Sequence, residues 1–210
     1  TRSISLTEAG REYLERARSA LALLDEARAT ASNLAGMPTG RLRLNAPMSF
    51  GFRHVAPAIS GFLARYPGVH VDLTLNDRVV DLVEEGYDMA IRIGRLKDSS
   101  LVAKRLADCR IVIAASPDYL ARKGVPQTPE DLASHDCLNY SYWSDRDSWP
   151  FVRDGREITV KIRGPLVSNN GESLVAAASG GAGIVMQPTF IACDALRAGQ
   201  LQVILEAWST

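Results

Sequence analysis

Apolar and small residues between positions 6 and 34 recur at alternating steps of four and three. A mean step of 3.5 residues is the a/d pattern of a left-handed coiled coil. The residues between these positions are mostly charged and of both signs, so the opposite face of such a helix is polar. We call these positions the seam, and they are Leu6, Gly10, Tyr13, Ala17, Ala20, Leu24, Ala27, Ala31 and Leu34.

The seam predicts a helix over residues 7–35 that pairs with a second copy of the chain. About 28 residues at ~1.5 Å each make a rod of roughly 42 Å, which is too long to bury its seam against a small domain. The alternative is an ordinary amphipathic helix packed on its own domain. The residues that we expect in the dimer interface are Tyr13, Ala17, Ala20, Leu24, Ala27 and Ala31.

Strand and helix patterns alternate after the breaker-rich stretch 36–40. Alternating or mostly apolar stretches at 41–45, 69–75 and 87–93 predict three strands. Helical stretches at 50–66 and 78–85 separate them. This order indicates two right-handed crossover units in a parallel sheet.

The second half of the chain predicts more strands than helices. The expected strands are 101–106, 109–115, 137–142, 151–152, 158–162, 166–168, 184–186 and 201–205. Helix starts are expected at Ser116-Pro117, Thr128-Pro129, Asn169-Asn170-Gly171 and Pro188, and a hairpin turn at 153–156. We therefore expect two α/β halves, 40–107 and 108–206, with 207–210 leading back toward the first.

Composition and charge narrow the class of protein. The hydrophobic content of 46% and charged content of 23% are typical of a soluble globular chain. A net charge of zero offers no electrostatic grip on nucleic acid. Cys109, Cys137 and Cys193 have the spacing of neither a disulfide framework nor a zinc knuckle, and suit a reducing compartment. No apolar run approaches the roughly 18 residues of a membrane span.

Nothing in the sequence indicates an enzyme, a metal site or a cofactor. His54, His70 and His135 share no metal-ligand spacing with one another or with the cysteines. The glycines at 180, 181 and 183 invite a nucleotide-loop interpretation, but a phosphate loop leads from a strand into a helix. These glycines leave a helix and enter a strand, so a helix C-cap with tight packing explains them better.

Two predicted helix starts carry the polar side chains most suited to a ligand. Ser49 follows a strand and a proline turn, and Asn169 with Asn170 has the same arrangement in the second half. A helix N-terminus offers unpaired N–H donors and partial positive charge, which suit a carboxylate. The alternative is that these side chains only cap their own helices. One such start in each half favours a binding cleft between them.

The chain resembles the LysR-type transcriptional regulators over essentially its whole length. Residues 1–10 are similar to the end of that family's winged helix-turn-helix domain, with its tail at 1–6, running into the linker helix. Residues 38–47 look like the entry into its effector-binding domain. Further segments similar to ones frequent in the family are 82–94, 115–120, 128–132 and 182–184 followed by Pro188.

The resemblance implies a cytoplasmic bacterial regulator of α/β fold. Two Rossmann-like subdomains of periplasmic-binding-protein type II architecture, I at 40–107 and II at 108–206, would follow the dimerising linker helix. Family members bind DNA as homodimers or homotetramers and hold a small-molecule effector, here expected to be a carboxylate, between the subdomains. Aromatic acids are expected if Phe50, Tyr140 or Trp143 reach the cleft. The effector contacts carried over are Ser49, Phe50, Asn76, Asn169 and Asn170. Arg92, Glu172 and Met186 are added because they lie at strand and helix ends.

Arg92 and the function of the chain each have an alternative interpretation. A structural ion pair is the alternative for Arg92. A solute-binding protein of a transport system is the alternative function, although the seam argues against it. The helix-turn-helix is absent from the residues given, as are the family's final strand and helix after Trp208. We therefore expect a fragment, or the ordered part, of a longer chain.

Overall fold

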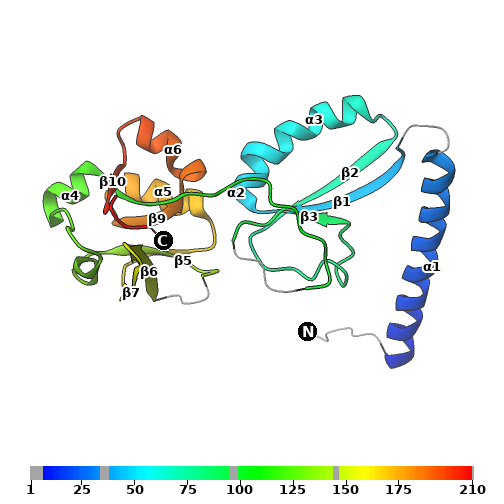
Figure 1. Ribbon diagram of the computed structural model, residues 1–210, viewed down its shortest axis with the longest axis horizontal. Coiled ribbons are helices and arrows are strands. Elements are labelled where there is room, and N and C mark those ends of the chain that lie inside the picture. The colour runs from blue at the N-terminus through cyan, green and yellow to red at the C-terminus, as the bar shows by residue number, and fades with distance from the viewer. Residues whose placement is uncertain (1–6, 34–37, 95–98, 144–146, 210) are drawn as a thin grey trace, which may run out of the picture.

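Two α/β lobes and one separate helix make up the computed structural model, which describes residues 7–33, 38–94, 99–143 and 147–209. Figure 1 shows the lobes side by side, with the helix at the far end of the first lobe. The expected tail 1–6, the seam position Leu34 and the side chain of Ala31 lie outside the described part.

The separate helix, α1 (Glu8–Asn33), lies within the predicted range 7–35. The Thr7 hydroxyl accepts a hydrogen bond from the Gly10 amide at 3.1 Å and caps its start. Within this single chain the seam faces solvent, with Tyr13 76% and Leu24 61% exposed. Large apolar side chains at coiled-coil spacing are usually buried in an interface, and the chain's own lobes do not bury these.

The first lobe contains a three-stranded parallel sheet with a helix packed on one face. Its strands are β1 (Gly40–Ala46), β2 (Val69–Leu75) and β3 (Met89–Ala90), in the order β2-β1-β3. The connection from β1 to β2 is a continuous helix of three parts, α2 (Met48–Phe50), a π-helical turn at Gly51–Val55 and α3 (Ala56–Arg65). Leu44, Ala46 and Val55 form the core between sheet and helix.

The π-helical turn has a cause in the sequence. Pro57 lacks an N–H group, and its ring crowds the carbonyl four residues earlier, which is that of Arg53. The Ala56 amide bonds to the Gly51 carbonyl five residues back instead. The predicted helix 50–66 is therefore present but contains a π-helical turn that includes Arg53.

Three predictions for the first lobe are wrong. The helix expected at 78–85 is an irregular segment with a turn at 82–86, because the Asp81 carboxylate accepts hydrogen bonds from the amides of Val83 and Glu84. The strand expected at 87–93 is only the two residues of β3. Residues 101–106 form no strand, since they are exposed and no other strand pairs with them.

The second lobe is a mixed sheet in the order β10-β4-β9-β5-β8. The strands β4 (Ile111–Ala115) and β9 (Ile184–Pro188) are antiparallel to each other, whereas β5 (Cys137–Tyr140) runs parallel to β9 and to β8 (Val167–Ser168). The edge strand β10 (Gln202–Ile204) is antiparallel to β4. The strands predicted near 109–115, 137–142, 166–168, 184–186 and 201–205 are confirmed in type.

Helices and a hairpin cover the two faces of this sheet. On one side lie α4 (Pro117–Lys123), the 3₁₀ helix Pro129–Ser134 and the hairpin β6 (Ser148–Arg153) and β7 (Arg156–Lys161), around buried Trp149 and Phe151. On the other lie α5 (Gly171–Ser179) and α6 (Thr189–Arg197). The predicted hairpin turn is confirmed, with positive φ at Asp154 and Gly155.

Candidate functional site

The carboxyl end of the first sheet faces the second lobe. Figure 1 shows α2, which follows β1, between the two lobes and next to α5 and α6. Backbone hydrogen bonds extend the ladder past the strands, from the Asn76 amide to the Ala46 carbonyl (3.0 Å) and from Ile91 to Asn45 (2.8 Å). In open α/β sheets ligands bind at such carboxyl ends.

Ser49 does not cap its helix. The N-cap of α2 is Pro47, whose side chain makes no capping hydrogen bond, and the Asp77 carboxylate rather than Ser49 accepts from the Met48 amide there. The Ser49 side chain is buried and its Oγ has no hydrogen-bond partner in the described structure. A buried hydroxyl without a partner costs free energy, so this group is suited to receive a ligand atom.

Two further predicted residues have unpaired buried atoms at the same edge. The Oδ1 of Asn76 and an Nη of Arg92 are buried without a hydrogen-bond partner. Burial lowers the pKa of the Arg92 guanidinium, and the nearby Asp77 carboxylate opposes that shift. Among the described residues no carboxylate forms an ion pair with Arg92, and Asp77 is the first of the charges that favour its guanidinium.

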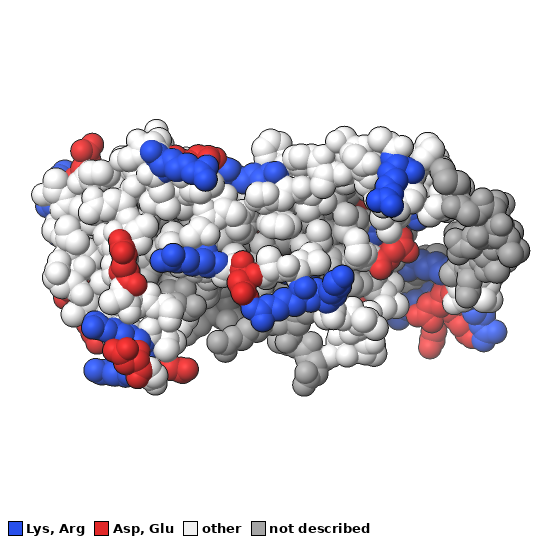
Figure 2. All heavy atoms as spheres, turned by 45° about the horizontal axis from the view of Figure 1, so that its top comes forward, with Lys and Arg blue, Asp and Glu red and all other residues white. Residues whose placement is uncertain are grey.

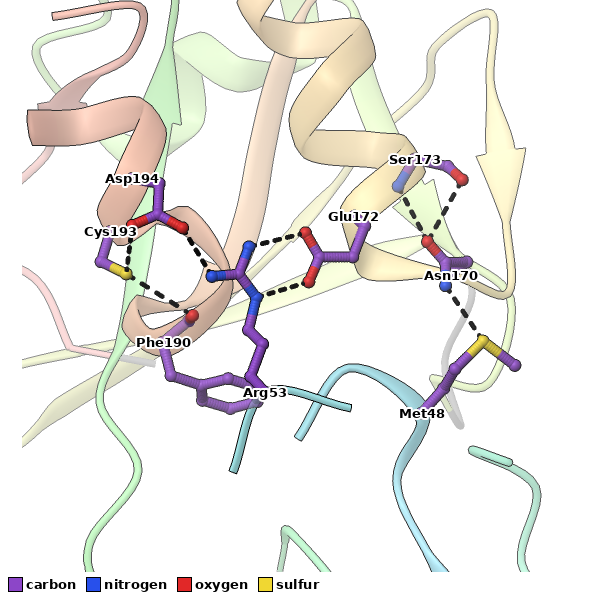
Figure 3. A network of polar contacts seen from close by, with 8 residues as sticks. All are labelled: Met48, Arg53, Asn170, Glu172, Ser173, Phe190, Cys193 and Asp194. Atoms are coloured by element: carbon purple, nitrogen blue, oxygen red, sulfur yellow. Dashed lines mark hydrogen bonds and ion pairs between the residues drawn. The ribbon is translucent and has the colours of Figure 1, made fainter. Parts of the chain in front are cut away.

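Asn170 caps its own helix, which was the alternative prediction, and it also contacts the first lobe. Its Oδ1 accepts a hydrogen bond from the Ser173 amide at 2.9 Å, as the N-cap of α5. Its Nδ2 donates to the Met48 sulfur at 3.2 Å, so the two predicted helix starts meet (Figure 3). Asn169 is exposed beside it.

Asp77 interacts with Met48 of the first lobe and with Tyr140 of the second. Its Oδ1 accepts a hydrogen bond from the Met48 amide at 2.8 Å. Burial, and then the Asp77 carboxylate, raise the pKa of the Tyr140 phenol above its usual range. Tyr140 thus reaches the inter-lobe region, whereas Trp143 packs against the core beneath the hairpin.

Arg53 joins the lobes, and the sequence analysis missed it. Its Nε and Nη2 donate to the two carboxylate oxygens of Glu172 at 2.8 and 3.1 Å, and Nη1 donates to Asp194 at 2.6 Å (Figure 3). Beside this ion pair the Phe50 ring meets Phe190 edge to face, with centroids 5.5 Å apart. Glu172 and Phe50, both predicted effector contacts, therefore bridge the lobes in this arrangement.

Met186 lies away from the other predicted contacts. It is 3% exposed on β9, in the core that the hairpin covers. The prediction placed it by strand end alone, but alternation along β9 turns its side chain inward to that core.

Two surface hollows lie elsewhere. A hollow of about 430 Å³ is lined by Arg41, His70, Val71 and Asp72, which are at or near the amino ends of β1 and β2. Another of about 310 Å³ runs from Val125 to Trp208 at the outer edge of the second lobe. Neither hollow is lined by Ser49, Asn76 or Arg92. The buried, unpaired polar atoms of these three residues favour the inter-lobe edge as the ligand site.

Metal and nucleic-acid chemistry find no support in the described residues. No group of three or more His, Cys, Asp and Glu side chains in that part of the chain could hold a metal ion. On the face drawn in Figure 2, basic and acidic side chains are interspersed rather than gathered into a basic patch. None of the described helices has the length and hydropathy required to cross a bilayer.

Removal of the Arg53 side chain tests the link between the lobes. We expect Arg53→Ala to lower the free energy of unfolding by about 1 kcal/mol, because partly exposed ion pairs contribute little more. A double-mutant cycle with Glu172→Ala, read by urea unfolding, isolates the pair. The control is Arg65→Ala, since Arg65 lies in the last turn of α3 with its guanidinium over the Tyr66 ring. A coupling of zero would mean that the pair does not hold the lobes.

The ion pair between Arg53 and Asp194 depends on pH. Arg53 holds the pKa of the Asp194 carboxyl below its ordinary value of 3.8. A depressed pKa contributes stability above the unfolded-state pKa, and that contribution is lost as the pH falls through the folded-state pKa. The Arg53–Asp194 contact is therefore intact at neutral pH and weakens only below about pH 4.

Two α/β lobes, with helix starts meeting at the end of a parallel sheet, define the class as a periplasmic-binding-protein type II fold. The chain belongs to the LysR family: the profile described as the LysR substrate binding domain matches residues 35–210. The protein is a DNA-binding transcriptional regulator of the LysR type, which confirms the predicted family, fold class and function.

The relatives support this assignment along nearly the whole chain. An uncharacterized HTH-type transcriptional regulator of Haemophilus influenzae is 39% identical over 98% of this chain and 71% of its own length. The HTH-type transcriptional activator AaeR of Escherichia coli K12 is 32% identical over 100% of this chain and 68% of its own length. These relatives are regulators rather than enzymes, and none favours the alternative of a transport protein.

Solved structures agree with the sequence comparison. CrgA, a LysR-type transcriptional regulator from Neisseria meningitidis, superposes with a TM-score of 0.72 at 32% identity, over 100% of this chain and 71% of that one. The Vibrio cholerae virulence activator AphB gives 0.74 at 26% identity, over 98% and 70%. Both likenesses include the linker helix, because they span nearly all of this chain.

Proposed function

We propose that this chain is the oligomerisation and sensing part of its regulator. The linker helix, residues 7–35, pairs two copies, and the lobes, 40–107 and 108–206, hold a small-molecule effector between them. The observation that carries the proposal is the buried, unpaired Ser49 hydroxyl at a helix start that contacts Asn170 of the other lobe. The protein would act in the cytoplasm, on DNA, as a homodimer or homotetramer.

Effector binding would act through the angle between the lobes. An effector shifts a conformational equilibrium only by its difference in affinity for the two states. The contacts that such a shift would change are those joining the lobes: the Arg53–Glu172 ion pair, the Phe50–Phe190 ring pair and the Asn170–Met48 hydrogen bond. The proposed contacts with the effector are Ser49, Asn76, Arg92, Asn169 and Asn170, with Phe50 and Glu172 near them.

A thermal-shift screen of small organic acids tests this proposal. An acid that binds the folded state raises its melting temperature. With the acid so found, we expect Ser49→Ala to weaken binding about tenfold in calorimetry, because one hydrogen bond to a charged group is lost. Ser60→Ala is the control, since its hydroxyl bonds only to the Pro57 carbonyl within α3. Unchanged affinity in Ser49→Ala would remove Ser49 from the site.

A further inference from the structure

Asn45 is a polar residue in the middle of a buried strand, and the sequence analysis did not single it out. It lies on β1 between Leu44 and Ala46, is 0% exposed, and neither atom of its carboxamide has a hydrogen-bond partner in the described structure. Buried amide groups are rarely left so. The carboxamide of Asn45 could be placed with its oxygen and nitrogen exchanged. Because both atoms are unpaired, the side chain needs one donor and one acceptor from a partner in either orientation.

Asn45 shares a face of the sheet with two other unpaired groups. Leu44, Ala46, Leu75 and Ile91 all pack in the core beneath α3. Side chains alternate between faces along a strand, so their neighbours Asn45, Asn76 and Arg92 point to the opposite face.

The sheet register brings these three residues close together. Asn45 pairs laterally with Thr74 of β2 and Ala90 of β3, two residues before Asn76 and Arg92 respectively. Diagonal neighbours of this kind lie about 7–8 Å apart at the backbone, within reach of one small molecule. We call Asn45, Asn76 and Arg92 the polar triad.

The polar triad requires more than a simple carboxylate. The Arg92 Nη and the Asn45 Nδ2 are donors that need acceptors, whereas the oxygens of Asn45 and Asn76 are acceptors that need donors. A carboxylate only accepts, so it satisfies the first two groups and leaves the amide oxygens unpaired. A hydroxyl or amino group on the same molecule supplies the missing donors.

We infer that the effector is a small carboxylate that also carries a hydroxyl or amino donor, with Arg92 binding the carboxylate and Asn45 reading the donor. This inference rests on the proposed function and narrows its ligand class. The charged groups around Arg92 are compatible with it. Asp77, Glu85 and Tyr87 favour the charged guanidinium, and Arg78 opposes it. Asp77 is already engaged by the Met48 amide, and Glu85 by Arg78 at 2.6 Å.

Matched pairs of acids test the inference by calorimetry and thermal shift. The pairs are propionate with lactate and alanine, succinate with malate and aspartate, and benzoate with 4-hydroxybenzoate. For at least one pair we expect the donor-bearing acid to bind wild type about tenfold or more tightly than its parent. In Asn45→Leu that ratio falls toward one, and in Arg92→Gln both acids lose about tenfold or more.

Variants without ligand show whether Asn45 has a merely structural role. Asn45→Leu should keep or raise the melting temperature, since it removes an unpaired buried amide. The control is Asn139→Leu in the second lobe, where Asn139 is also buried but its Oδ1 accepts a hydrogen bond from the Tyr140 amide at 2.9 Å. Asn139→Leu should lower the melting temperature. Arg65→Gln is the control for loss of a charge.

Three outcomes would overturn the inference. They are equal binding of parent and donor-bearing acids, a preference that survives in Asn45→Leu, and no stabilisation by any of these acids at about 10 mM. The proposed function fails separately. The proposed function survives if a compound of another class binds and its affinity falls in Ser49→Ala but not in Asn45→Leu. The proposed function fails if neither Ser49→Ala nor Arg53→Ala changes the affinity of any compound that binds.

Discussion

Leu24→Glu is expected to raise the dissociation constant of the proposed dimer at least about 100-fold and so to leave single chains. Leu24 occupies a seam position and is 61% exposed in the single chain. In a pair of helices it would be buried, and the substitution would bring two carboxylates into an apolar seam at the symmetry-related position. Sedimentation velocity or light scattering measures the result.

A matched control separates pairing from helix stability. Ser19→Glu adds the same charge at an exposed position outside the seam, where the Ser19 hydroxyl bonds only to the Glu15 carbonyl. We expect it to leave the mass in solution unchanged. If Leu24→Glu also sediments as wild type does, the helix does not pair through this face, and the seam serves another purpose.

Gly183→Ala is expected to lower the free energy of unfolding by about 3 kcal/mol, at the upper end of the usual range for overpacking. A Cβ on Gly183 would lie 2.2 Å from the carbonyl oxygen of Asp136. That oxygen is fixed, because it accepts the Ile184 amide at 2.8 Å where β5 and β9 pair. The strand pairing would have to shift to admit a methyl group. Urea unfolding followed by circular dichroism measures the loss.

Gly180→Ala is the control for that substitution within the same glycine-rich stretch. Gly180 is the C-cap of α5 with φ −77°, and the nearest atom to an added Cβ would be the Ala177 carbonyl oxygen at 3.4 Å. Its effect on the free energy of unfolding should stay within about 0.5 kcal/mol. Equal effects of the two substitutions would contradict the packing explanation of Gly183.

Elements that depend on residues near one another in the chain are those that the sequence predicts. The linker helix, β1, β2, the hairpin and the start of α5 were predicted because periodicity, a cap or turn residues act within a few positions of one another. The segment 78–85 failed because Asp81 satisfies backbone amides in a turn, which competes with a helix. Residues 101–106 have strand composition but no neighbouring strand to pair with.

The residues of the candidate site also fall into those that the sequence could predict and those that it could not. Ser49, Asn76 and Arg92 could be predicted, since each follows a strand at the carboxyl end of a parallel sheet. Arg53 could not, because its partners Glu172 and Asp194 are 119 and 141 residues away. Asn45 gave a weak signal, as the one amide within an otherwise alternating strand, but only the structure leaves it unpaired.

By itself the sequence determined the seam of the linker helix, the two α/β halves and the helix starts that carry Ser49 and Asn170. These follow from contacts between residues near one another in the chain. Only the tertiary structure decided that Arg53 joins the lobes, that Met186 lies in a core and that Asn45, Asn76 and Arg92 share one face of a sheet. Those facts depend on strand register and on the packing of distant segments, which local patterns do not encode.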